Sequence, residues 1–145
     1  MIASRAVALF GWVLVLTACQ GAAEAPVTDE VAETAAGLRL GELQGSELRS
    51  PYEGREVLVQ GVVTGNFVAG LDGFFMQDAA GEHDADPETS DGVFVHWPRG
   101  SAPRVRRGDR VRVAGVVAER GEGDATQTVI EATEVQPQGR GATAA

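Results

Sequence analysis

The sequence predicts an all-β domain, a small closed barrel of five strands. Three observations predict it: short runs rich in valine and aromatic residues recur along the chain, turn residues separate them, and no segment has the periodicity of a convincing amphipathic helix. Two of the runs contain an internal glycine where a sheet can bend, which favours a closed barrel over a flat sheet with two free edges. A sandwich of two sheets has similar strand numbers and stays open as an alternative.

Five segments have the composition of strands, and three of them alternate apolar and polar residues. In chain order they are EVLVQGVVT (56–64), GFFMQD (73–78), GVFVHW (92–97), DRVRVAGVVAE (109–119) and TQTVIEATEV (126–135). Successive side chains of a strand point to opposite faces, so the alternation assigns an inner and an outer set. The inner, core-lining set comprises Val57, Val59, Val63, Phe74, Met76, Val93, Val95, Trp97, Val111, Val113 and Val117.

The outer set combines aromatic, amide and guanidinium side chains. A single-strand binder needs this combination, because bases stack on rings while arginines hold the backbone. The predicted ligand-binding residues are Gln60, Thr64, Phe75, Gln77, Phe94, His96, Arg110 and Arg112, with further contacts from the connections at 66–70 and 120–125. The arginines at 104, 106 and 107 extend the positive patch. The alternative is that the phenylalanines cover a barrel end and the arginines pair with the abundant carboxylates.

The N-terminus predicts export and lipid anchoring. Arg5 precedes an apolar run of thirteen residues (6–18), which has the pattern of a signal peptide and is too short to cross a bilayer as a mature helix. The run ends in LTAC (16–19), which resembles the bacterial lipobox. This resemblance implies lipidation of the Cys19 sulfur, and Gln20 in the next position favours the outer membrane. We therefore expect an exported lipoprotein of the cell envelope, held in the outer membrane and facing the periplasm or the cell surface.

The remaining ends of the chain predict flexible segments. Residues 20–36 are rich in Ala, Glu and Thr without apolar periodicity, which is typical of a tether. The turn and small residues of PQGRGATAA (137–145) predict a disordered tail. The expected organisation is a signal peptide at 1–18, the lipidated cysteine and tether at 19–37, the barrel at 38–136 and the tail at 137–145.

The charge balance limits the ligands that the protein can bind through bulk electrostatics. The chain has 145 residues with 21 acidic and 12 basic side chains, all of the latter arginine, and a net charge of −9. Binding of nucleic acid through overall charge requires the opposite sign, although a local basic patch remains compatible with the composition. Cys19 is the only cysteine, so an internal disulfide is excluded.

The motifs VQGVVTGNF, GFFMQD, SDGVFVHW and GDRVRVAGVVAE together resemble the OB-fold. More narrowly, LGELQGSELRSPYEGREVLVQGVVT with GFFMQD and DADPETSDGVFV is similar to the N-terminal OB-like domain of large secreted bacterial endonucleases, over about residues 38–136. The resemblance implies an OB-fold-like barrel with an accessory role, because nuclease chemistry in those proteins belongs to a separate downstream domain. Pro98, Gly100 and Pro103 leave little room for the helix that usually precedes the fourth strand, so the capping of one barrel end stays open.

An acidic loop, EHDADPETSD (82–91), lies between the second and third predicted strands. Its carboxylates suit a hard cation, but the spacing is not that of an EF-hand, since Thr89 and Val95 occupy the positions of the required glycine and glutamate. A solvated loop, a weak calcium site and a transition-metal site at His83 stay open, the last without a second His or Cys at ligand spacing. The candidate calcium ligands are Asp78, Asp84, Asp86, Glu88 and Asp91.

Motifs of catalysis are missing from the sequence. It has no phosphate loop, HExxH, cysteine pair or GxSxG, and its two histidines have no evident nucleophile. We therefore expect a monomeric, non-catalytic, lipid-anchored OB-fold module that binds single-stranded oligonucleotide or another oligomeric ligand. The alternative is a structural or protein-interaction lipoprotein of the cell envelope, with calcium ordering the acidic loop.

Overall fold

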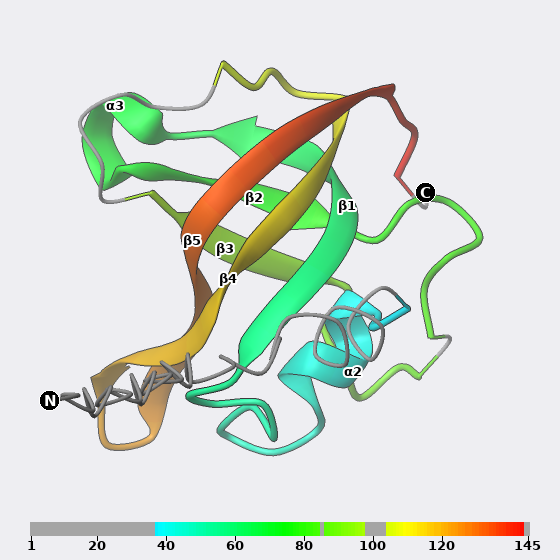
Figure 1. Cartoon of the computed structure of the whole chain (residues 1–145). Coiled ribbons are helices and arrows are strands. Elements are labelled where there is room, and N and C mark those ends of the chain that lie inside the picture. Colours follow the sequence, from blue (N-terminus) through cyan, green and yellow to red (C-terminus); the bar gives the residue numbers. More distant parts are fainter. Residues whose placement is uncertain (1–36, 85, 98–103, 144–145) are drawn as a thin grey trace, which may run out of the picture.

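The strands close into a barrel in the computed structural model, which describes residues 37–84, 86–97 and 104–143. The strand order is β1-β2-β3-β5-β4, and β4 returns to β1 (Figure 1). Neighbouring strands are antiparallel except for β3 and β5, which are parallel. The predicted all-β, five-stranded OB-fold-like barrel is confirmed. The strands are β1 (Glu56–Asn66), β2 (Gly73–Gln77), β3 (Gly92–His96), β4 (Asp109–Glu122) and β5 (Ala125–Arg140).

Several sequence predictions lie outside the described residues. They are the signal peptide, the lipidated Cys19, the tether up to residue 36 and the segment that holds Pro98, Gly100 and Pro103. Within the described ranges, no helix combines the length and apolar character needed to cross a membrane.

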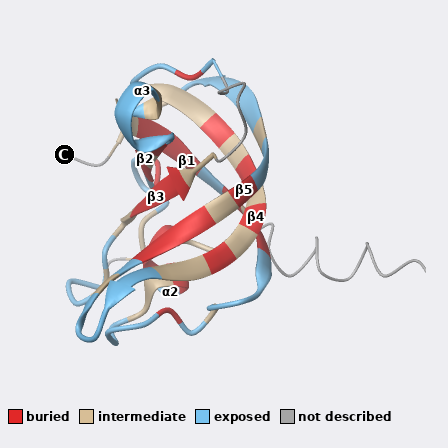
Figure 2. Ribbon diagram, turned by 90° about the vertical axis from the view of Figure 1, so that its left-hand side faces the viewer, coloured by how far each residue is buried: buried red, intermediate tan, exposed pale blue. Residues whose placement is uncertain are grey.

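Alternation along the strands predicts the core correctly. Val59, Phe74, Met76, Val95 and Val113 are each at most 1% exposed and belong to one hydrophobic cluster. Figure 2 shows buried positions as alternating bands along β4 and β5. The apolar side chains of the inner set therefore pack inside the barrel, as expected from the two-residue repeat of a β-strand.

Gly61 and Gly115, the internal glycines of the two predicted runs, lie where neighbouring strands approach closely. A Cβ at Gly61 in β1 would come 2.7 Å from the Gln77 carbonyl oxygen, and one at Gly115 in β4 would come 2.5 Å from the Glu131 carbonyl oxygen. The ladder between β4 and β5 shifts register between Ala114 and Gly115. A register shift bends a strand and increases its twist, so Gly115 lies at a point where the sheet curves toward closure.

Helix α2 (Leu40–Gln44) precedes β1 and packs its apolar side chains against one end of the barrel, near the start of β1 (Figure 1). Leu40 and Leu43 are fully buried in the core cluster. The carboxylate of Asp78, just after β2, accepts a hydrogen bond from the Leu40 amide at 2.9 Å and so satisfies a free amide at the start of the helix. A helix of five residues is too short to show periodicity, so the sequence did not predict this element or the shorter α3 (Val68–Leu71).

The prediction of a disordered tail beginning at residue 137 is wrong over its first residues. Strand β5 continues to Arg140, which lies opposite Asp109 in the ladder with β4, and Thr143 makes an isolated bridge to Ala79. Pro137 lies opposite Val111, directly at a register shift where a strand tolerates a residue without an amide hydrogen. The long partner strand β4 therefore orders a segment whose composition resembles that of a loop.

Candidate functional site

A groove lies on the outside of the barrel, where β2 and β3 approach the first residues of β5. Its volume is about 670 Å³, within the range of ligand-binding clefts. Phe75 and Phe94 line it side by side, with ring centroids 4.8 Å apart. Thr64 and Gln77 also line it, so four of the eight predicted ligand-binding residues come together here.

The groove exists because the sheet is incomplete between β3 and β5. The two strands pair only over Phe94–His96 of β3 and 129–131 of β5. Residues before these segments, Gly92 on one strand and Thr128 on the other, line the groove instead. The side-chain amide of Gln44, at the end of α2, donates to the Gly92 carbonyl oxygen, and both residues line the groove.

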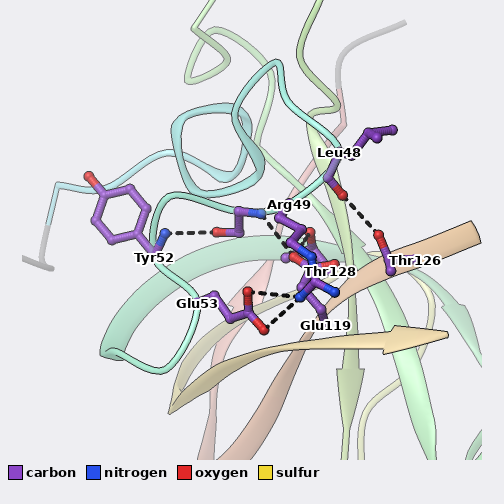
Figure 3. A network of polar contacts seen from close by, with 8 residues as sticks. Leu48, Arg49, Tyr52, Glu53, Glu119, Thr126 and Thr128 are labelled. Atoms are coloured by element: carbon purple, nitrogen blue, oxygen red, sulfur yellow. Dashed lines mark hydrogen bonds and ion pairs between the residues drawn. The ribbon is translucent and has the colours of Figure 1, made fainter. Parts of the chain in front are cut away.

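The loop between α2 and β1 forms one wall of the groove and is fixed to the β4–β5 hairpin. Glu119 Oε1 accepts hydrogen bonds from the Ser50 amide at 2.9 Å and from Thr128 Oγ1 at 2.7 Å. Thr126 Oγ1 donates to the Leu48 carbonyl oxygen at 2.8 Å (Figure 3). The wall is therefore held in place before any ligand arrives, which lowers the entropic cost of binding.

Sequence reasoning missed this wall and the facing residues of β5. Leu48, on the wall, is 66% exposed and lines the groove. Nothing in the local sequence around Leu48 distinguishes it from other loop residues, because its position depends on contacts with residues almost eighty positions away.

The aromatic face differs from the prediction at Phe94. This ring was expected to be exposed on the outer face, but it is only 7% exposed because it lies over Gly73 of β2, where a Cβ would come 2.4 Å from its Cζ. The accessible part of the aromatic surface is instead supplied by Phe75 and by Phe67, whose rings meet edge to face at 5.8 Å. Phe67 is 48% exposed, at the end of β1.

The predicted arginines do not share the groove with the aromatic rings. Arg110 and Gln60 line a separate, smaller hollow of about 240 Å³, and Arg112 lies opposite Gln60 on the β1–β4 ladder. Arg110 Nη2 lies 2.8 Å from both carboxylate oxygens of Glu82, so for this arginine the alternative of pairing with carboxylates is confirmed. A closed barrel turns the outer sides of its strands in diverging directions, which separates residues that a flat sheet would bring together.

His96 is also outside the groove lining. Its Nδ1 lies 2.6 Å from Glu131 Oε2, and Arg120 donates through Nε to the other oxygen of the same carboxylate at 2.9 Å. These three side chains form a polar network, with an ion pair between Arg120 and Glu131, beside the parallel β3–β5 pairing. His96 therefore has a carboxylate partner within the protein.

Two carboxylates of the acidic loop accept hydrogen bonds from other residues of the same loop. Asp84 accepts hydrogen bonds from the Asp86 amide and the Thr89 hydroxyl, and Asp86 accepts one from the Glu88 amide. Such contacts are those of turns built on aspartate side chains. Across 37–84, 86–97 and 104–143, no three His, Cys, Asp or Glu side chains come together as metal ligands. Calcium binding by this loop stays a prediction.

Asp78 is the candidate calcium ligand whose environment changes its chemistry most. Its side chain is buried, and this burial raises the pKa of Asp78 to about 6 from 3.8, with the nearby Asp91 acting in the same direction. Hydrogen bonds from the Leu40 and Gly41 amides and the charge of Arg39 lower the pKa but do not offset the burial. Between about pH 4 and pH 6 the folded state therefore binds more protons than the unfolded state.

We expect this carboxyl group to destabilise the barrel as the pH rises through that window. The contribution of Asp78 to the free energy of unfolding is most favourable below about pH 4 and falls by about 3 kcal/mol by neutral pH, following the shift of its pKa. Asp78→Asn should remove this dependence. The measurement is urea unfolding of both proteins at several pH values, and the difference in their free energies of unfolding should change with pH.

Asp124→Asn is the matched control for this experiment, because Asp124 is exposed in the turn between β4 and β5. Its difference from the wild type should stay constant across the same pH range. If the difference in free energy of unfolding between the wild type and Asp78→Asn also stays constant with pH, burial does not perturb the Asp78 carboxyl group.

Comparison with known proteins does not assign this chain to a family: no family model and no curated protein matches it. The resemblance to the OB-like domain of secreted endonucleases therefore stays a prediction. What the described residues establish is the barrel, its outer groove and the separation of that groove from the arginines.

Proposed function

We propose that this protein is a non-catalytic, lipid-anchored binding module of the cell envelope whose oligomeric ligand lies in the outer groove. The observation that carries the proposal is the groove itself, about 670 Å³ in volume and lined by Phe75 next to hydroxyl and amide side chains. The lining is mostly polar, with Leu48 and Phe75 as apolar positions, so hydrogen bonds to the lining would hold most of an oligomeric ligand. The lipid anchor rests on the lipobox resemblance at Cys19.

Binding rather than catalysis is supported by the chemistry of the lining. The described residues around the groove include two carboxylates, Glu47 and Glu88, both exposed on loops, beside neutral polar and apolar side chains. General acid and base catalysis depends on groups that are held in place by their surroundings, whereas these carboxylates lie in solvent. Glu47 and Glu88 therefore suit electrostatic attraction of a ligand.

Single-stranded nucleic acid, the ligand class that the strand pattern favours, is the first one to test. Exposed rings can stack on bases, and Phe75 with Phe67 supplies such rings. The arginines needed for phosphates lie on the side of the barrel formed by β1 and β4. An oligonucleotide would therefore have to extend beyond the groove to reach Arg112.

The experiment is fluorescence anisotropy of a labelled oligothymidylate, titrated with the exported chain purified in mild detergent. If the groove is the site, Phe75→Ala should weaken binding at least about fivefold, because stacking on one ring is worth about 1–3 kcal/mol. A double variant, Arg110→Ala with Arg112→Ala, reports separately on the arginine side. Loss of binding in the double variant with full binding in Phe75→Ala would place the ligand outside the groove and contradict the proposal.

A further inference from the structure

The charge of the groove selects against phosphate polymers. Glu47 and Glu88, from two different loops, are the charged residues among the described groove lining, and both are acidic. Arg49, which follows Leu48 in the loop that forms the wall, donates to Glu53 at 3.1 Å and is not part of the described lining. With a net charge of −9 on the whole chain, the field in the groove favours a neutral or cationic ligand.

The neutral lining is suited to peptide groups. Gln77, Gln127, Ser46 and Ser90 are exposed and line the groove from different segments. Amide side chains donate and accept hydrogen bonds and hydroxyls do the same, so this lining complements both the N–H and the C=O of an extended backbone. Sugar hydroxyls would also bond to such a lining, but a neutral sugar forms no ion pair with Glu47 or Glu88, whereas a basic peptide does.

The apolar positions of the groove point to a ligand with large side chains. Leu48 is 66% exposed on the wall, and Phe75 lies in the base next to the buried Phe94. An isolated exposed leucine is ordinary on a protein surface, but one that lines a groove next to an aromatic base can pack against an apolar side chain of a ligand. Aromatic and leucine side chains of a partner would gain burial at these two positions.

We propose that the groove binds an extended polypeptide segment of a partner protein, one that carries lysine or arginine together with apolar side chains. The proposal rests on the proposed function and names its ligand class. The basic side chains pair with Glu47 and Glu88, the apolar side chains pack on Leu48 and Phe75, and the backbone bonds to the amide and hydroxyl side chains of the lining. The fixed loop wall means that the groove is formed before the segment binds.

The experiment selects ligands from a phage-displayed library of random dodecapeptides, using the exported chain in mild detergent as bait and its Phe75→Ala variant as counter-bait. The wild type should enrich peptides of net positive charge that contain aromatic residues or leucine. A fluorescein-labelled copy of the most enriched peptide is then titrated by anisotropy. Phe75→Ala should weaken its binding at least about tenfold, and binding should weaken as salt is raised.

A pair of charge variants tests the role of the two carboxylates. Glu47→Gln combined with Glu88→Gln should weaken the peptide about threefold to tenfold and reduce the dependence on salt. The matched control is Glu56→Gln combined with Glu122→Gln, which removes the same charge from exposed residues outside the groove lining and should leave binding within about twofold of wild type. Circular dichroism of each variant confirms that the barrel is folded.

The outcomes separate the inference from the proposed function. Enrichment of acidic peptides, or equal binding to the Phe75→Ala variant, would overturn the inference. The inference would also be overturned if no peptide is enriched while a labelled oligothymidylate or chitohexaose binds and this binding depends on Phe75. In that case the proposed function would stand. If peptides, oligothymidylate and chitohexaose all fail to bind, both proposals are overturned.

Discussion

Phe74→Ala is expected to destabilise the barrel by about 3–5 kcal/mol, which is a large part of the stability of a domain of this size. Phe74 is fully buried, belongs to the core cluster and is among its largest side chains. Truncation removes the buried ring and leaves a cavity. The surrounding β-strands cannot easily move inward to fill this cavity. Urea unfolding followed by circular dichroism measures the loss.

Phe67→Ala is the matched control, because this ring is 48% exposed at the edge of the outer aromatic cluster. Its cost should stay below about 1 kcal/mol. Phe74→Leu keeps the fold measurable if the alanine variant does not fold, and its cost should fall between the other two. Equal costs for Phe74→Ala and Phe67→Ala would contradict the assignment of Phe74 to the core.

Gly115→Ala is expected to cost about 2–3 kcal/mol although it adds one methyl group. The new Cβ would come 2.5 Å from the Glu131 carbonyl oxygen and 2.8 Å from Ile130 Cγ2. The first contact is with backbone that belongs to the long β4–β5 ladder, so relief of the clash requires the two strands to separate at the register shift. The midpoint of thermal unfolding should fall accordingly.

Gly70→Ala tests whether the effect at Gly115 comes from close approach rather than from the loss of a glycine as such. Gly70 lies in α3, and a Cβ there meets no atom within 4 Å. We expect a change within about 0.5 kcal/mol, in the stabilising direction because alanine loses less entropy on folding. A large loss in both variants, or in neither, would contradict the role of Gly115 as a contact point between strands.

The acidic loop and the tail show why composition is a weak guide to the order of a segment. Asp78 was grouped with the loop carboxylates as a metal ligand, yet its side chain is buried and bonded to the start of α2. Residues 137–140 have the composition of a loop, yet they pair with β4. In both cases a partner distant in sequence determines the environment of the residue.

The sequence by itself determined the presence of the five strands and the inward-facing set of apolar side chains on them, because alternation records directly which side chains face inward on a strand. Val113 and Phe74 were assigned to the core from alternation alone, and both are fully buried. Only the tertiary structure decided where the outer residues meet. Phe75 lines a groove while Arg110 lines a different hollow, since closure of the barrel turns the outer sides of successive strands apart. The wall of that groove comes from the loop after α2, which long-range hydrogen bonds fix to β4 and β5.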